Sequence, residues 1–89
     1  MRALRRWTVE VYVGEDEGRT YAEAALRDDI GNQILGQGGA RLNPADPDVP
    51  EIGDEIAVAR ALVDLGHRLL STASSDITAV THEPVTLTH

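Results

Sequence analysis

Three histidines are the side chains best suited to acid–base or metal chemistry in this sequence: His67, His82 and His89. Asp64 stands three residues before His67, a spacing that puts both on one face of a helix, and Glu83 follows His82 directly. An imidazole and a carboxylate placed in this way are ligands that Zn²⁺ accepts. The HExxH spacing of a helical zinc site is missing, however. Ordinary surface polar residues explain these positions, and we predict neither a metal nor a cofactor.

Other patterns that resemble catalytic or ligand-binding motifs lack the context that the chemistry needs. The segment 36–39 resembles a phosphate-binding loop, but such a loop opens directly into a helix and, for nucleotides, carries a lysine. The chain has no lysine. The acidic segment 46–55 is interrupted by prolines and lacks the EF-hand spacing, and no serine lies in a nucleophile-elbow sequence. We therefore predict a protein that is not an enzyme.

Arginine and tyrosine are the stronger candidates for a binding surface. The planar guanidinium of arginine pairs bidentately with carboxylate or phosphate. The predicted binding or interface residues are Arg5, Arg6, Arg19, Arg27, Arg41, Tyr12 and Tyr21. Eight basic residues against fifteen acidic ones give a net charge of −7, which opposes binding to a phosphate backbone. Contact with nucleic acid would require the arginines to converge on one open face of a sheet.

Length and composition predict a single small domain with a thin core. The 89 residues include no Phe, one Trp and two Tyr, so burial depends on smaller side chains that remove less apolar area from water. A second copy of the chain would add stability. The absence of Cys favours a reducing compartment, and no apolar run is long enough to span a bilayer. We expect a cytoplasmic protein that does not bind membranes.

The elements that position the candidate residues begin with three strands, predicted at about residues 6–13, 19–28 and 33–43. The first two show the alternation of a half-buried strand, and the polar segment 14–18, with Gly at each end, predicts a hairpin loop. Glycines at 36, 38 and 39 predict a bulge in the third strand. The residues expected on one face of the second strand are Thr20, Ala22, Ala24 and Leu26.

Two helices are predicted after a connector of residues 43–50, where three prolines exclude strand and helix. The first should span about residues 52–72, with Asp54 or a neighbour as N-cap and its last turns near His67. Serines at 71–75 should end it, and a second helix should span about residues 75–82. The result is an α+β domain over residues 1–89: an antiparallel βββ meander with one long and one short helix on one face.

A family resemblance is carried by four blocks of the sequence. They are Ala40–Asp46, Val49–Glu55, Val58–Leu62 with Asp64–Gly66, and Asp76–Ile77 with Ala79–His82 and Pro84. A looser match at Trp7–Val9 and near Gly18 extends it over the first strands. In these blocks the chain resembles a family of small actinobacterial proteins, a domain of unknown function that includes mycobacterial proteins of the dormancy (hypoxia) response.

The resemblance implies a fold like that of double-stranded-RNA-binding domains (dsRBD-like) and a tendency to dimerise. The likeness of such proteins to ribosome hibernation factors implies, by analogy of fold, a role in ribosome silencing under stress. The family has no established catalytic residues. Its matched polar residues are therefore interpreted as a frame that joins the third strand, the connector and the helix: Arg41, Asp46, Glu51, Asp54 and Arg60.

We predict a non-enzymatic, stress- or dormancy-associated binding protein that acts as a homodimer through protein contacts. One alternative is a hibernation-type factor that contacts ribosomal RNA or protein. Readers of double-stranded RNA grip phosphates with cations at a helix end, whereas the predicted long helix opens with Glu51, Asp54 and Glu55. The other alternative is a metal-binding protein or enzyme that uses His67 or His82.

Overall fold

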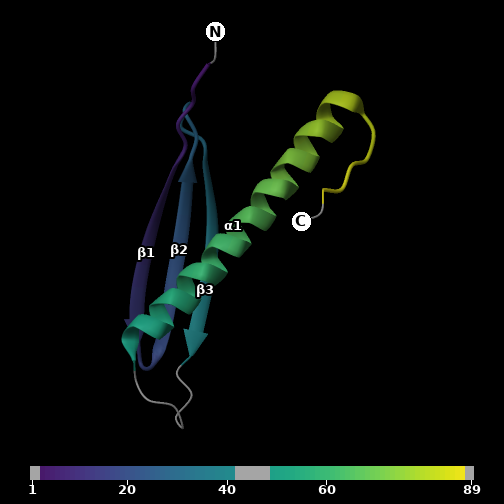
Figure 1. Cartoon of the computed structure of the whole chain (residues 1–89). Helices are drawn as coiled ribbons and strands as arrows, with labels where there is room; N and C mark the ends of the chain where they lie inside the picture. Colours follow the sequence, from purple (N-terminus) through teal and green to yellow (C-terminus); the bar gives the residue numbers. More distant parts are fainter. Residues whose placement is uncertain (1–2, 42–48, 88–89) are drawn as a thin grey trace.

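A computed structural model of the chain describes residues 3–41 and 49–87. Three strands, β1 (Thr8–Asp16), β2 (Arg19–Arg27) and β3 (Gln33–Arg41), precede one helix, α1 (Pro50–Thr81). The strands form an antiparallel sheet in the order β1-β2-β3. Figure 1 shows α1 crossing one face of this sheet diagonally, with its C-terminal part extending beyond the strands. The predicted α+β class and three-stranded meander are confirmed.

The β1–β2 connection is tighter than the sequence suggested. Pairing continues to Asp16 opposite Arg19, so only Glu17 and Gly18 form the turn, with positive φ values of 48° and 75°. Two left-handed residues in succession match the twist of a two-residue hairpin. The predicted loop of residues 14–18 was therefore wrong in its first three residues, and β1 extends three residues beyond its predicted end.

The β2–β3 turn is organised by Asp28. Its Oδ1 accepts hydrogen bonds from the backbone N–H groups of Ile30 (3.0 Å) and Asn32 (2.8 Å), an arrangement that asparagine and aspartate commonly make in turns. Partial burial acts to raise the pKa of Asp28, but these hydrogen bonds outweigh it and hold the pKa below its ordinary value. Gly31, with φ of 92°, supplies the left-handed residue that the turn needs.

The glycines of β3 bring the helix close to the sheet. A Cβ on Gly36 would lie 2.5 Å from the carbonyl oxygen of Ala61, and one on Gly38 would lie 2.5 Å from that of Ala57. Pairing with β2 runs without interruption from Arg19–Arg41 to Arg27–Gln33, so the predicted bulge was wrong. The glycine density reflects contact between two backbones, which only a residue without Cβ permits.

The helix is one continuous element of 32 residues, and the predicted break at 71–75 does not occur. Hydroxyl groups need not end a helix when they bond back to the preceding turn, as Thr72 and Thr81 do by donating to the carbonyls of Arg68 and Ile77. The predicted N-cap was also wrong: α1 begins at Pro50 after Val49, without a side-chain cap. Proline suits this position because its missing N–H has no partner in a first turn.

The core between α1 and the sheet is small. Among the residues that the structure describes, the buried apolar ones are Ala22, Ala24, Ala25, Leu26, Ala57, Ala61 and Leu65. As predicted, one face of β2 is buried, Thr20 included. On β1, Val9, Val11 and Val13 pair with residues of that face, yet they remain 39–44% exposed. Thus α1 covers β2 and β3 and leaves β1 largely bare. Within residues 3–41 and 49–87, no helix is both long and apolar enough to cross a membrane.

Candidate functional site

The sheet face turned away from α1 gathers most of the predicted binding residues. Because side chains alternate along a strand and paired residues share a side, the register places five of the seven on this open face. These are Tyr12, Arg19, Tyr21, Arg27 and Arg41. The candidate site is therefore the open face, a surface built by regular strands rather than by loops.

Tyr21 stands at a hollow in the open face because its neighbours have no side chains. It lies on the central strand, paired with Gly14 of β1 and Gly39 of β3. Residues lining a depression of about 450 Å³ include Tyr12, Gly14 and Tyr21. A Cβ at Gly14 would meet no atom within 4 Å, so packing does not require this glycine. The pairing of two glycines with one tyrosine emerges only from the hairpin register, and sequence inspection alone missed it.

Both tyrosines have charged neighbours. The Tyr12 hydroxyl donates to a carboxylate oxygen of Glu10 at 2.5 Å, and this hydrogen bond raises the pKa of Tyr12 above its ordinary value. The guanidinium of Arg19 lies 5.6 Å from the centre of the Tyr21 ring, within the range of a cation–π contact. The open face therefore offers aromatic surfaces, a phenol that stays protonated and a positioned cation.

The arginines lie at opposite ends of the open face. Arg19 pairs with Arg41 at one end, and Arg27 ends β2 at the other, roughly 26 Å away at the usual rise per strand residue. Arg5 lies near the Arg27 end, with its Nε 3.9 Å from a carboxylate oxygen of Asp29, and Arg6 is exposed before β1. The acidic residues that share the open face are Glu10, Asp16 and Glu23. Its charges are thus balanced and interleaved, not gathered into a basic groove.

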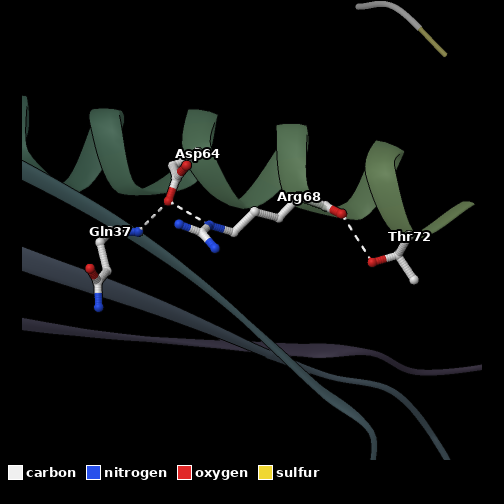
Figure 2. A network of polar contacts seen from close by, with 4 residues as sticks. All are labelled: Gln37, Asp64, Arg68 and Thr72. Carbon is white, nitrogen blue, oxygen red and sulfur yellow. Dashed lines mark hydrogen bonds and ion pairs between the residues drawn. The ribbon is translucent and has the colours of Figure 1, made fainter. Parts of the chain in front are cut away.

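The outer edge of β3 is covered by polar side chains of α1. Figure 2 shows Asp64 accepting hydrogen bonds from the backbone N–H of Gln37 (2.8 Å) and from Nε of Arg68 (2.9 Å). Arg60 donates to the carbonyl oxygen of Gly39 at 2.7 Å. These bonds occupy edge groups that would otherwise be free to pair with another strand. The Gln37 hydrogen bond, followed by that from Arg68, holds the pKa of Asp64 below its ordinary value.

Replacing Asp64 with asparagine should lower the stability of the fold at neutral pH. A carboxyl whose folded pKa is depressed contributes stability above its unfolded pKa of about 3.9, and that contribution is lost as pH falls through the folded pKa. The gap between wild type and Asp64→Asn should therefore be full at pH 7 and narrow below about pH 4. Chemical denaturation over this pH range measures it. Glu83→Gln, an exposed carboxylate just beyond the same helix, is the control, and a gap that did not depend on pH would contradict the prediction.

The histidines considered as metal ligands or catalytic groups do not form a metal site in the part of the chain that the structure describes. Within residues 3–41 and 49–87, no three His, Asp or Glu side chains are placed to hold a metal ion. Asp64 is engaged by Gln37 and Arg68. His67 and Arg68, predicted in the last turns, lie in the middle of α1. Of the predicted polar frame, Arg60 does contact β3, whereas Asp46 lies outside the described residues.

Three antiparallel strands backed by one helix define this chain as a small α+β protein with a polar and aromatic sheet face. Its sequence matches the family model described as Rv2632c-like over residues 5–86. The chain belongs to the Rv2632c-like family. The predicted relationship to small mycobacterial proteins is thereby confirmed.

Similar proteins occur in Mycobacterium tuberculosis. The uncharacterised protein MT1780 is 55% identical over 84 residues, covering 94% of this chain and 88% of that protein. The uncharacterised protein Rv2632c is 51% identical over 81 residues, covering 91% and 86%. The crystal structure of Rv2632c matches with a TM-score of 0.81 and 46% identity, covering 93% of this chain and 98% of that one. The fold described above is therefore similar to one determined by experiment.

Proposed function

We propose that this protein is a non-catalytic homodimer that binds a protein partner through the open face of its sheet. The observation that carries the proposal is the character of that face: two tyrosines, a hollow at Tyr21, and arginines interleaved with carboxylates. Tyrosine and arginine are enriched where proteins contact one another. An extended segment or loop of a partner, carrying charges of both signs, fits a surface of this kind.

The homodimer is supported by how little the single chain buries. Of the seven buried apolar residues in the described part of the chain, five are alanines. Its accessible surface of 7013 Å² exceeds by about 1,900 Å² the roughly 5,100 Å² of a compact protein of this mass. Its radius of gyration is 16.7 Å, against about 12 Å for a compact domain of this length. The excess area is more than the ~800 Å² per partner that a standard interface buries.

A ribosome-associated role is the second candidate. The observation that favours it is the presence of three arginines and two tyrosines on one sheet face, since bases of single-stranded RNA stack on such aromatic rings. Against it stand the three carboxylates on the same face and the net charge of −7. The stress or dormancy setting, the dsRBD-like grouping and the cytoplasmic location rest on the resemblance and on composition.

The two candidates differ in how their binding depends on salt. If the partner is a protein, affinity capture from a cell lysate should retain it at 150 mM salt and above. Binding that neutralises few phosphates depends only weakly on salt. Gly14→Leu, which fills the hollow beside Tyr21, should reduce capture about tenfold, the loss of roughly one central interface contact. Arg68→Gln, which removes a charge on the helix side of the sheet, should have no such effect.

Sedimentation with purified ribosomes tests the ribosome-associated role. Association that weakens steeply between 50 and 200 mM salt, and that Arg19→Gln weakens more than Arg68→Gln, would replace protein recognition with RNA contact. Size-exclusion chromatography with light scattering tests the dimer. A monomer at micromolar concentration would remove it from the proposal without affecting the open face.

A further inference from the structure

The side of α1 turned away from the sheet carries an apolar seven-residue repeat. Its members alternate in steps of four and three residues through the helix. They are Ile52, Ile56, Ala59, Val63, Gly66, Leu70, Ala73, Ile77 and Val80. The residues packed against the sheet, Ala57, Ala61 and Leu65, occupy the opposite side of the helix. A repeat of this period is typical of a helix that pairs with another helix. We call these nine residues the outer stripe.

Seven of the nine outer-stripe residues are exposed in the single chain. Ile52 is 54% exposed, Val63 57% and Val80 80%. The segment after α1 turns back beside the C-terminal part of the stripe, where the backbone N–H of Leu87 donates to Ser74 Oγ at 3.1 Å, and Leu70 and Ala73 are half-buried there. An apolar stripe of this length on a small acidic protein requires a cover, because isolated soluble chains rarely expose contiguous apolar surface on this scale.

Gly66 gives an independent indication that a second helix approaches. Glycine in the middle of a helix is unfavourable relative to alanine, and a Cβ at Gly66 would meet no atom within 4 Å. No described residue of the chain therefore explains it, in contrast to Gly36 and Gly38. Small residues recur at seven-residue intervals, at Ala59, Gly66 and Ala73. They let a neighbouring helix approach closely on the exposed side.

Resting on the proposed homodimer, we infer that the outer stripes of two copies pack against each other with α1 antiparallel to α1 of the partner. The register that the side chains favour sets each large residue against a small one. It places Ile56 opposite Ala73 of the other copy, Leu70 opposite Ala59, and Val63 opposite Gly66, with Ile52 facing Ile77 at both ends. Each small residue provides the hole that a large one fills.

A parallel pair would satisfy the side chains less well. Equivalent residues would then meet, so that layers of Ile, Val and Leu would alternate with empty layers at Ala59, Gly66 and Ala73. Charge favours the parallel pair instead, because Glu55 would approach Arg60 of the other copy, whereas the antiparallel pair brings Glu55 near Asp76. Exposed ion pairs contribute little and voids in an interface are costly. Packing therefore decides the orientation.

The antiparallel pair also accounts for the exposed Leu62, which is 44% exposed on the flank of α1 that faces β1. In the proposed register it meets the part of Leu69 of the other copy that remains outside that copy's own core, against which Leu69 is partly buried. The dimer is then a four-layer arrangement in which two helices lie between two sheets. Both open faces remain accessible to partners.

Two substitutions with light scattering test which surface holds the dimer. Gly66→Leu should convert the dimer to monomer at 10 μM, raising the dissociation constant at least 100-fold, although leucine favours the helix and meets free space in the single chain. Val63→Asp should do the same. Gly14→Leu, also a glycine with free space around it but on the open face, should leave the dimer intact. Dimers of both stripe variants would overturn the inference.

Cysteine cross-linking tests the orientation, with no native cysteine to interfere. In the antiparallel register Ile52 and Ile77 of different copies are adjacent, but Ile77 lies about 37 Å from its own equivalent at 1.5 Å per residue. A mixture of Ile52→Cys and Ile77→Cys proteins should be joined by a short bis-maleimide, and neither alone should be. Cross-linking of Ile77→Cys alone would overturn the antiparallel pair.

The outcomes separate this inference from the proposed function. A wild-type monomer would remove both the dimer and the helix pair. A wild-type dimer that survives Gly66→Leu and Val63→Asp would keep the homodimer and reject the outer stripe as its interface. If Gly66→Leu prevents folding, the cross-linking of full-length cysteine variants still decides the question, because it leaves the small residues in place.

Discussion

Gly38→Ala should destabilise the protein by about 3 kcal/mol, because overpacking a tight contact typically costs 1–3 kcal/mol and more where backbone must move. The added Cβ would meet the backbone nitrogen of Ala61 and, at 2.5 Å, the carbonyl oxygen of Ala57. Neither can turn away as a flexible side chain would. The helix would have to lift from β3, where Arg60 and Asp64 hold it.

The neighbouring residue supplies the control. A Cβ on Gly39 would meet Thr20 at 3.5 Å, an ordinary contact, and it would point to the open face. Gly39→Ala should therefore change stability by no more than ~0.5 kcal/mol. Thermal unfolding of both variants at equal protein concentration measures the difference, which should be about 12–24 °C at 4–8 °C per kcal/mol for a domain of this size. Equal melting temperatures would show that α1 does not approach β3 this closely.

Leu65→Ala should destabilise the fold by about 3 kcal/mol, the usual cost of a buried leucine. Leu65 is 6% exposed and is one of two buried leucines within residues 3–41 and 49–87. Most of the other buried residues are alanines, whose short side chains cannot reach into the space left behind. The surroundings would collapse only partly, which keeps the cost high.

Leu4→Ala is the matched control for Leu65→Ala, because Leu4 is 88% exposed. It should change the free energy of unfolding by less than ~0.5 kcal/mol. Urea unfolding of both variants gives the comparison. If Leu65→Ala cost no more than Leu4→Ala, the face of α1 that packs on the sheet would be wrongly assigned, and the outer stripe with it.

In the proposed dimer, two surfaces of the molecule serve two tasks. The outer stripe joins two copies, and the open face, on the far side of each sheet, stays available to a partner. Substitutions at Gly66 and Gly14 should separate these tasks, since each glycine lies in free space on a different surface. A dimer that displays two equivalent open faces can bind two copies of a partner segment.

Local patterns predicted the strands well and the helix ends poorly. Alternation identified β2 and its buried face from Thr20 to Leu26. The type of a turn depends on φ values, so the two-residue turn at Glu17 and Gly18 was missed. Serine and threonine at 71–75 predicted a helix end because these residues compete for backbone hydrogen bonds in isolated segments. Their hydroxyls can bond within the helix instead, as that of Thr72 does.

The candidate site was predicted in its residues but not in its arrangement. Arginine and tyrosine could be chosen by type alone, and five of the seven share the open face because pleated strands separate side chains by parity. Their grouping into two distant ends, and the glycines beside Tyr21, depend on register. Register joins residues that are far apart in the chain, so no local window contains it.

By itself, the order of residues determined the class of fold, the acidic charge and the lack of cysteine and lysine chemistry, since these follow from composition and short-range periodicity. Only the tertiary structure decided why β3 is rich in glycine and which side of α1 is left uncovered. Both depend on how closely and at what angle a helix crosses a sheet. That geometry is set by contacts between distant segments, and those contacts place Gly36 and Gly38 beneath α1 while leaving Gly66 exposed.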